Sequence, residues 1–390
     1  MSVSPLRILT MTDVLPDPDK GASGAEVQTV DALRAQGHHV DAIWSDTLGR
    51  RIRHGNLHLL IELPRTYARG VAEMMRRASY DVAHVSQPHG FRAARVVHEI
   101  APGCAFIHRS HGFELHVEEA LRPWRARFPD SRRGFRRLAS AGMQGLVARH
   151  SYAIAREADG HIVSSSLDAA FLKERIGVPT EKIAVIPQAA PAEYQRVPPM
   201  AMTRERARRV LHVAQFAFFK APMVTASTMR LLAAACPDVE FTWVCDRAHH
   251  EAVRALLDSG TNRRTELLHW MPQEELRRVY DRCGIFLFPS FFEGFGRAFL
   301  EAMSRGLCVL ASDCGGMHDV IDGRNGVLVP VGDAEALAHA GRRLIEDTQG
   351  AAAMSTAAAS SAREYSWDRV ARETVAFYRR RLAAIRSERP

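Results

Sequence analysis

The sequence has 390 residues, of which 46% are hydrophobic and 25% are charged, and this balance favours a folded protein of two α/β domains. It contains no run of about 18 apolar residues, and its first residues lack the charged and apolar regions of a signal peptide. We therefore expect a cytoplasmic protein without a membrane span. The six cysteines are scattered and form no Cys-x-x-Cys pair, so we expect buried thiols.

The formal net charge of +8 at pH 7 predicts an acidic partner, which could be nucleic acid, anionic lipid or a phosphorylated substrate. Nucleic acid fits less well, because no helix-turn-helix, zinc-finger or RNP-type motif is present. Residues 121–150 hold eight arginines against one acid, Asp130, with apolar residues between them. This pattern is typical of a basic amphipathic helix on an anionic membrane, and equally of a solvated helix face. The predicted membrane or acceptor patch consists of Arg132, Arg133, Arg136 and Arg137.

The first half of the chain alternates short apolar runs with helical stretches. Strands that alternate with helices form a parallel, doubly wound sheet. The sequence therefore predicts a Rossmann-like domain over residues 1–195. We expect its helices to include 25–35 and 168–175, and its strands to lie at 6–11, 39–44, 57–63, 81–85, 105–110, 160–164 and 183–187.

A second alternation follows residues 196–207, a segment without strand character that we interpret as an interdomain linker. Residues 208–366 are predicted to form a second Rossmann-like domain. The last helix, in residues 367–390, is amphipathic, and we expect it to pack back toward the N-terminal domain. Two such domains would face each other across a cleft, where we expect the active site. The expected strands of the second domain are 209–216, 239–245, 266–271, 283–289, 308–312 and 326–330.

Residues 289–316 carry the main chemical signal in the sequence. An apolar strand ends at the beginning of this segment, a loop that contains Glu293 follows, and Glu301 lies in the helix after the loop. In open α/β sheets, ligands bind at the carboxyl ends of strands, which is where Glu293 is predicted to lie. The backbone amides of Phe295 and Gly296, at the helix start, would point toward an anion or a hydroxyl group.

Two interpretations of the two glutamates remain open at this point. In the first, one carboxylate holds the sugar of a nucleotide diphosphate sugar and the other holds its ribose. In the second, Glu301 forms an exposed ion pair with Arg297 or Arg305, each four residues away, and Glu293 only complements the helix dipole.

A family resemblance extends over nearly the whole chain. The block EGFGRAFLEAMSRG at residues 293–306 resembles the Glu-x7-Glu region of the family-4 retaining glycosyltransferases, which have the GT-B architecture. Blocks that resemble other parts of the same family are SGAEVQTVDALRAQGHHV, DVAHVSQP, RSHGFE, ADGHIVSSS, GVPTEKIAVIP and YSWDRVARETVAFYRR. The resemblance implies two Rossmann-like domains that face each other across a cleft. Residues 1–195 would form the acceptor-binding domain, and residues 208–366 would form the nucleotide-sugar-binding domain.

The resemblance also implies roles for the residues of the Glu-x7-Glu block. Glu293 would contact the hydroxyl groups of the donor sugar. Phe295 and Gly296 would offer their backbone amides to the same sugar, and Glu301 would bind the ribose.

The residues expected near the diphosphate include one departure from the family. Lys220 matches a lysine that neutralises the diphosphate, and Ser23 and Gly24 match paired glycines whose backbone approaches the phosphates. His111 matches a histidine near the transferred sugar. The family usually has an arginine at the position of Gln215, which can donate a hydrogen bond but carries no charge. Losing the charge-assisted contact that an arginine would make with the diphosphate costs roughly 1.5–3 kcal/mol.

The function that the resemblance implies is retaining glycosyl transfer, with no cofactor and no metal. Catalysis would then depend on positioning and on electrostatic stabilisation of the leaving diphosphate. We predict that a hexose-type sugar moves from a nucleotide diphosphate sugar to a glycan acceptor in surface polysaccharide synthesis. The acceptor would be lipid-linked or close to the membrane, and the protein would be peripheral on the inner face of the membrane.

Two alternatives remain open on the sequence alone. A non-catalytic GT-B protein would bind a sugar nucleotide or a partner enzyme without turnover, and Gln215 is the reason to consider it. A hydrolysing sugar-nucleotide epimerase of the same architecture would need acid-base carboxylates in the N-terminal domain, for which the sequence shows no clear candidate.

Overall fold

The structure is a computed structural model that describes residues 4–128 and 135–388, with only the backbone of residues 135–143. The chain divides into a first unit, Met1–Pro187 with Trp367–Pro390, and a second unit, Gln188–Ser366. Each unit contains one six-stranded sheet in which all neighbouring strands are parallel. The predicted fold class, two doubly wound Rossmann-like domains, is confirmed.

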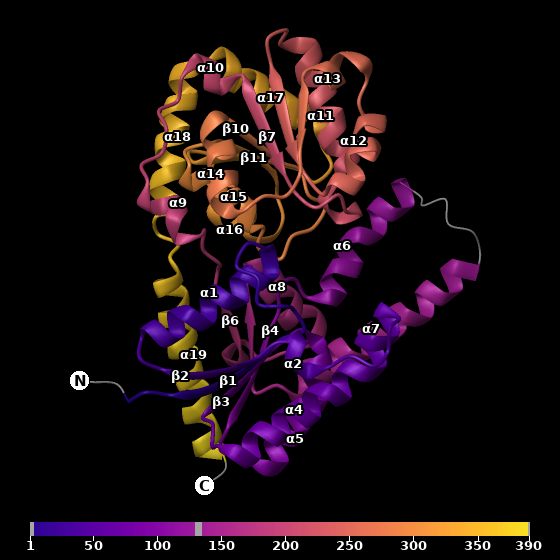
Figure 1. The fold of residues 1–390 in the computed structure, drawn as a ribbon, viewed down its shortest axis with the longest axis vertical. Helices are drawn as coiled ribbons and strands as arrows, with labels where there is room; N and C mark the ends of the chain where they lie inside the picture. The colour runs from indigo at the N-terminus through magenta and orange to yellow at the C-terminus, as the bar shows by residue number, and fades with distance from the viewer. Residues whose placement is uncertain (1–3, 129–134, 389–390) are drawn as a thin grey trace. The chain divides into compact units, whose positions relative to one another are not determined.

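The sheet of the first unit has the strand order β2-β1-β3-β4-β5-β6 (Figure 1). Its strands are β1 (Arg7–Met11), β2 (His39–Ile43), β3 (Val82–Ser86), β4 (Ala105–Arg109), β5 (Gly160–Val163) and β6 (Ile183–Val185). Its longer helices are α1 (Gly21–Ala35), α4 (Leu63–Arg77), α5 (Phe91–Ile100), α6 (Glu114–Arg127), α7 (Phe135–Glu157) and α19 (Trp367–Glu388). Its short helical turns are α2 (Ser45–Leu48), α3 (Gly55–Leu57), η1 (His58–Glu62), η2 (Pro88–Gly90), α8 (Ser166–Phe171), η3 (Leu172–Ile176) and η4 (Thr180–Lys182).

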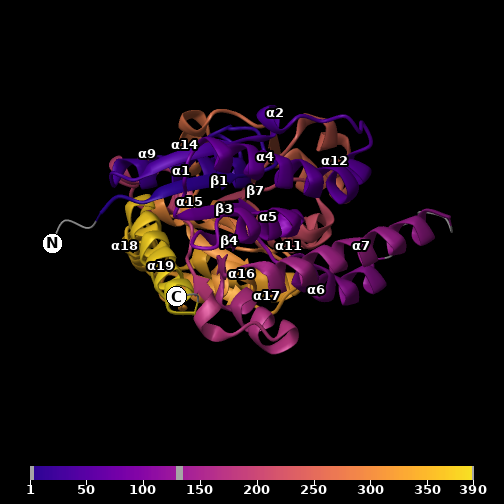
Figure 2. The same cartoon turned by 90° about the horizontal axis from the view of Figure 1, so that it is seen from below.

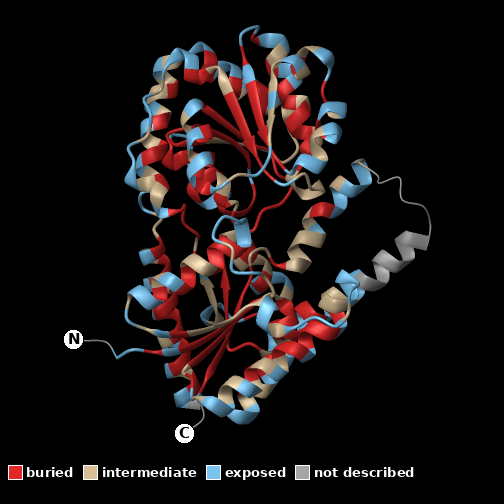
Figure 3. Ribbon diagram, in the orientation of Figure 1, coloured by how far each residue is buried: buried red, intermediate tan, exposed pale blue. Residues whose placement is uncertain are grey.

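Helices cover both faces of this first sheet. Helices α1 and α19 pack together on one face, and α4, α5 and α7 cover the other (Figures 1 and 2). Every residue of β3 and β4 is buried, which agrees with apolar runs that are covered on both sides (Figure 3). Both Figure 1 and Figure 2 show α6 and α7 extending away from the sheet.

One predicted strand of the first unit, residues 57–63, is wrong, because these residues are helical and lead directly into α4. Leu60 and Leu63 are buried while Ile61 is exposed, which is the spacing of a helix face and not of a strand. Pro64 lies at the start of α4, directly after the π-helical turn η1 that joins the two helical segments.

The sheet of the second unit has the strand order β12-β11-β10-β7-β8-β9. Its strands are β7 (Arg209–Val213), β8 (Glu240–Val244), β9 (Thr265–Leu268), β10 (Ile285–Phe288), β11 (Cys308–Ser312) and β12 (Gly326–Val329). Its helices are α9 (Ala192–Arg196), α10 (Arg204–Ala207), η5 (Phe218–Lys220), α11 (Pro222–Ala235), η6 (Arg247–His249), α12 (His250–Leu256), α13 (Ser259–Arg263), α14 (Gln273–Arg282), α15 (Arg297–Ser304), α16 (Gly315–Val320), α17 (Ala334–Glu346) and α18 (Thr348–Ala362).

The segment expected as a linker, residues 196–207, packs as part of the second unit. Arg305 is fully buried, and its guanidinium donates to the carbonyls of Tyr194, at 2.9 Å, and Val197, at 2.5 Å. It also donates to the carbonyl of Pro198 at 2.9 Å. One side chain therefore fastens the beginning of this segment to α15. The α19 helix packs against α1 and β4 of the first unit.

Two expectations from composition concern the state of the cysteines and the presence of a membrane-spanning helix. All six cysteines are buried free thiols, as predicted. Among the helices of residues 4–128 and 135–388, none is both long enough and apolar enough to cross a membrane.

Candidate functional site

The strand order of the second sheet separates the loops that follow β7 and β10. These two strands are neighbours, but the chain leaves β7 toward β8 on one side and leaves β10 toward β11 on the other. In open α/β sheets, a reversal of this kind separates the two following loops and marks the ligand site at the carboxyl ends of the strands. Lys220 lies in the loop after β7, and Glu293 lies in the loop after β10.

Lys220 and Glu293 meet at this reversal. The ammonium group of Lys220 lies 2.6 and 2.8 Å from the two carboxylate oxygens of Glu293, and the Ser290 hydroxyl donates to one of these oxygens at 2.6 Å. The Glu293 side chain is buried and the Lys220 side chain is 16% exposed. The ammonium group also lies 5.2 Å from the ring centres of Phe219 and Phe288. Both predicted residues therefore stand side by side, with the lysine open to solvent on one side.

Glycines allow the loop after β10 to pack against the start of α16. The N–H of Gly316 donates to the carbonyl of Phe295 at 3.1 Å, and a Cβ atom on Gly316 would overlap the Phe295 ring. Gly296, with φ of 90°, has a left-handed backbone directly before α15. Within the described residues, no hydrogen bond from the amides of Phe295 and Gly296 to a backbone carbonyl is found.

Glu301 lies on the buried face of α15. Its carboxylate accepts from Arg297 at 3.0 Å and from the Tyr280 hydroxyl at 3.1 Å, and all three side chains are buried. Burial, together with the charge of Glu301, raises the pKa of Tyr280 well above its ordinary value. The alternative of an exposed ion pair is therefore wrong for Glu301. Arg305 instead pairs with Asp281, at 2.7 Å.

Gln215, the departure from the family pattern, lies just after β7 on the same sheet edge as Lys220. Its side chain is exposed, and its carbonyl accepts from the N–H of Ala217 at 2.8 Å. The position is therefore close in the chain to the lysine and open to a ligand. The side chain that stands there is neutral.

The first unit holds a second cluster, around His111. Nε2 of His111, which follows β4, lies 2.6 Å from a carboxylate oxygen of Glu26 on α1. The Ser86 hydroxyl, at the end of β3, donates to the same oxygen at 2.5 Å. His111 is 11% exposed and Glu26 is 6% exposed, so the carboxylate orients the imidazole from inside the fold.

Neighbouring side chains stabilise the ionised form of Glu26. Burial works to raise its pKa, but the hydrogen bond and charge of His111 and the charge of Arg109 hold it well below its usual range. Glu26 was not predicted as a functional residue. A signal was present in the sequence, because Glu26 lies on the same helical face as Val30 and Leu33, where a carboxylate needs a partner.

Ser23 and Gly24 lie inside the first turn of α1, which begins four residues earlier than predicted. The hydroxyl of Ser23 donates to the carbonyl of Leu15, and it accepts from the N–H of Asp17 at 2.9 Å. The N–H of Gly24 donates to the carbonyl of Lys20 at 2.7 Å. The amide of Gly24 is thus used within the helix, and Ser23 fastens the loop between β1 and α1.

The predicted arginine patch lies mostly outside the described residues. Arg132 and Arg133 are outside them, and Arg136 and Arg137 belong to the part of α7 whose side chains are not described. Among the side chains that the structure does describe, no three His, Cys, Asp or Glu residues are grouped to hold a metal ion.

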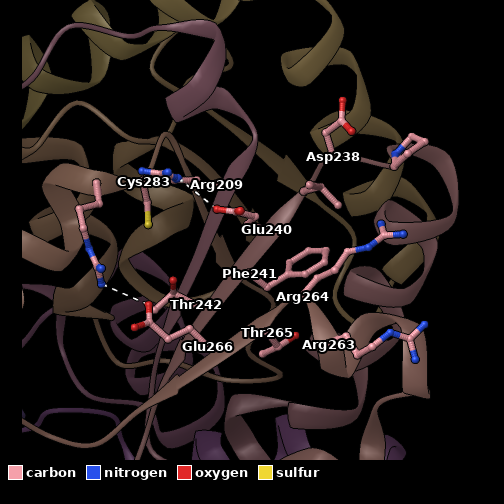
Figure 4. A pocket seen from close by; sticks show the side chains of 13 residues that line it. Arg209, Asp238, Glu240, Phe241, Thr242, Arg263, Arg264, Thr265, Glu266 and Cys283 are labelled. Atoms are coloured by element: carbon pink, nitrogen blue, oxygen red, sulfur yellow. Dashed lines mark hydrogen bonds and ion pairs between the residues drawn. The ribbon is translucent and has the colours of Figure 1, made fainter.

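A hollow of about 720 Å³ lies at the opposite end of the second sheet, near the first residues of β7, β8 and β9 (Figure 4). Two pairs of oppositely charged side chains lie in it. Arg209 lies 3.2 Å from Glu240, and Arg282 lies 3.3 Å from Glu266. Because it opens at the amino ends of the strands and its acids are already paired, this hollow is separate from the Lys220 and Glu293 site.

The comparisons with known proteins agree with this geometry. The sequence profile of Glycosyltransferase Family 4 matches residues 23–194, and that of Glycosyl transferases group 1 matches residues 207–347. A D-inositol 3-phosphate glycosyltransferase of Corynebacterium urealyticum is 28% identical over 245 residues, which are 58% of this chain and 58% of the relative. An O-antigen chain mannosyltransferase B of Escherichia coli is 33% identical over 113 residues, or 29% of each chain.

Matches to curated relatives are partial, whereas the fold matches over the whole length. The chain spans between 25% and 58% of the length of the first relatives that it matches. The structure of a sucrose-phosphate synthase from Thermosynechococcus elongatus superimposes with a TM-score of 0.77 and 20% identity. This match covers 97% of the present chain and 100% of the other, and it shows the fold.

Proposed function

The chain belongs to the family-4 glycosyltransferases of GT-B architecture, and on this premise we propose that it moves a hexose-type sugar from a nucleotide diphosphate sugar to a glycan acceptor. The observation that carries the proposal is the contact of Lys220 with Glu293 at the topological reversal of the second sheet. A cation for a diphosphate and a carboxylate for sugar hydroxyls are adjacent there.

The residues of the second unit act on the donor. The carboxylate of Glu293 accepts hydrogen bonds from sugar hydroxyls, and the ammonium group of Lys220 neutralises the diphosphate as it leaves. Hydrogen-bond donors that are already in place, including the amides of Phe295 and Gly296, stabilise the developing negative charge without having to move. Glu301, held by Arg297 and Tyr280, is the proposed ribose ligand.

The first unit contributes His111, with Glu26 as its positioning residue. The hydrogen bond from His111 to Glu26 holds the imidazole in one orientation at the carboxyl edge of the first sheet. We propose that the transfer retains the anomeric configuration and needs no metal, as the resemblance to the family implies. A product with the opposite anomeric configuration, read by NMR, or activity lost in EDTA and restored by Mn²⁺, contradicts this part.

The acceptor is proposed to belong to surface polysaccharide synthesis on the inner face of the membrane, where a cytoplasmic enzyme would act as a peripheral protein. An O-antigen mannosyltransferase among the relatives supports this assignment. Flotation with anionic liposomes, with and without the arginines of the predicted patch, tests it. Equal flotation of both proteins contradicts a role for that patch.

Calorimetry with a panel of nucleotide diphosphate sugars tests the donor site. We expect at least one donor to bind, and we expect Glu293→Gln to abolish the preference for the sugar over the bare nucleotide diphosphate. Lys220→Met should weaken the binding of both ligands. Arg230→Gln, at an exposed position on α11, should change the affinity for neither. Wild-type donor binding and transfer in Glu293→Ala would overturn the proposed function.

Two alternative functions also have to be tested, because specific residues favour each of them. Neutral Gln215 favours a non-catalytic sugar-nucleotide binder, which would bind donors without turnover for any acceptor. A hydrolysing epimerase would use carboxylates near His111. In addition to Glu26, the first unit has two such carboxylates, Asp13 and Glu114. Burial raises the pKa of Asp13, and it raises the pKa of Glu114 to about 8. Release of a free epimerised sugar without any acceptor identifies that activity.

A further inference from the structure

A second hollow, of about 590 Å³, lies in the first unit beside the amino-terminal half of α4. Its walls come from three segments: the loop after β2, the helical stretch from η1 into α4, and the first turn of α5. The loops that follow β2 and β3 both leave the carboxyl edge of the sheet. We name this hollow the arginine pocket, after its guanidinium groups, and its lining residues are Arg51, Ile52, Ile61, Glu62, Arg65, Ala68, Arg69 and Arg92.

Hydrogen bonds hold the backbone around the arginine pocket, and two of its guanidinium groups make local contacts. Arg65 donates to the carbonyl of Ile61 at 2.9 Å, and Arg69 donates to the Thr66 hydroxyl at 3.4 Å. Glu62 accepts from the amides of Arg51 and Ile52, both at 2.9 Å, and from Nδ1 of His58 at 2.8 Å. The guanidinium of Arg50, outside the pocket, donates to the carbonyl of Ile52 at 2.9 Å. The loop and the helix are therefore joined through a carboxylate that faces backbone amides.

The four arginines of the pocket have no acidic partner. In the part of the chain that the structure describes, Arg51, Arg65, Arg69 and Arg92 form no ion pair with a carboxylate. The hydrogen bonds from His58 and from two backbone amides lower the pKa of Glu62 to about 2, so this carboxylate is charged at neutral pH. Four positive groups then face one negative group, and an anion with several oxygens would balance the excess.

The walls between the arginines are apolar. Ile61 is 41% exposed, and Ile52 and Ala68 are half-buried beside it. An inorganic anion would leave these side chains in contact with water. A ligand that joins a phosphate to an apolar chain would cover the isoleucines and also neutralise the guanidinium groups.

The arginine pocket lies close to the His111 cluster. His58, which contacts Glu62 of the pocket, acts electrostatically on Asp13, and so do His111 and Glu26. Asp13 lies two residues after the end of β1, on the same sheet edge as the loops that follow β2 and β3. The pocket is thus a neighbour of the edge where the acceptor is proposed to react.

We propose that the arginine pocket binds the phosphate or diphosphate of a lipid-linked acceptor, with the first part of the lipid chain against Ile52 and Ile61. The proposal rests on the proposed function, because it names the chemical class of the acceptor. It places the anionic recognition of the acceptor in α4 and α5, away from the predicted patch at residues 132–137.

Binding of farnesyl diphosphate to the full chain, measured by calorimetry below its micellar concentration, tests the proposal. We expect farnesyl diphosphate to bind at least tenfold more tightly than farnesol or inorganic pyrophosphate. The double variant Arg65→Gln with Arg69→Gln should weaken binding at least tenfold. The matched control, Arg76→Gln with Arg77→Gln, removes the same charge from the other end of α4 and should stay within twofold of wild type. Melting curves show whether each variant folds.

Several outcomes overturn the proposal. Equal affinities for pyrophosphate and farnesyl diphosphate would show a site for a free anion. Binding to dioleoylphosphatidylglycerol vesicles without binding to farnesyl diphosphate would show a membrane surface. Equal weakening by both double variants would show a general charge effect.

The donor titrations keep this proposal distinct from the proposed function. If donors bind through Lys220 and Glu293 but farnesyl diphosphate does not bind, only the inference about the arginine pocket fails. If farnesyl diphosphate binds and no donor does, the proposed function fails.

Discussion

Replacing Glu26 by glutamine tests whether a buried charge holds His111. Glutamine has nearly the same shape but no negative charge, so the hydrogen bonds from His111, at 2.6 Å, and Ser86, at 2.5 Å, lose their ionised acceptor. Hydrogen bonds to charged groups contribute about 1.5–3 kcal/mol. Arg109, also buried, would lose a nearby counter-charge. We expect a loss of about 2–3 kcal/mol, or about 4–12 °C in the melting temperature of a unit of this size.

The effect of pH gives a second readout for the same variant. The pKa of Glu26 is lowered in the folded state, so the stability that its charge contributes is present above its ordinary value of 4.5. That contribution is lost as the pH falls from there toward the lowered value. The difference in melting temperature between wild type and Glu26→Gln should therefore be full at pH 7 and should shrink below pH 4.5.

The control for Glu26→Gln is Glu73→Gln, which breaks an exposed ion pair with Arg77 on α4. Exposed pairs of this spacing contribute about 0.3–0.5 kcal/mol, so the control should melt within 1–2 °C of wild type, by about 2–4 °C per kcal/mol. A positioning role also predicts that Glu26→Gln lowers kcat with little change in the KM for the donor, and that Glu26→Asp restores part of kcat. A wild-type melting temperature at both pH values would refute the buried charge pair.

Three further predictions concern the second unit. Gly316→Ala should destabilise it by about 1–3 kcal/mol in urea unfolding, because the added methyl group overlaps the Phe295 ring; an unchanged midpoint contradicts this packing. Burial lowers the pKa of His212 to about 4, so acidification from pH 6.5 to 4 should destabilise the unit by roughly 1.4 kcal/mol per pH unit for this residue. In His212→Leu, the free energy of unfolding should depend less steeply on pH, by the contribution of one proton. A slope equal to that of wild type contradicts this prediction. Gln215→Arg should strengthen binding of a nucleotide diphosphate about tenfold, as a gain of about 1.5 kcal/mol implies, and an unchanged affinity contradicts a missing clamp.

Most of the fold was predictable, because buried parallel strands are continuous apolar runs and the chain alternates them with helices. The error at residues 57–63 has the same origin. A short apolar run fits a buried strand or a helix equally well, and only its neighbours decide.

The candidate site was predictable only in part. Lys220 and Glu293 were found because both match motifs of a known family, but their contact joins loops 73 residues apart, and only the strand order brings the loops together. Spacing also left open whether Glu301 was an exposed ion-pair partner, which burial decides. Glu26 was missed because its partners come from other elements of the sheet.

Net charge was the weakest guide, because a charge count does not say which groups are free to meet a ligand. Arg206 and Arg305 are buried, and their guanidinium groups donate to backbone carbonyls, so neither can bind an anionic ligand from solution. Arg305 is also paired with Asp281. The four arginines of the arginine pocket come from three separate segments and form no run in the sequence. An anionic partner is selected by guanidinium groups that the fold leaves without a carboxylate, and this property depends on three-dimensional neighbours. The net charge therefore predicts only the sign of a partner's charge, and unpaired guanidinium groups in the fold indicate where such a partner would bind.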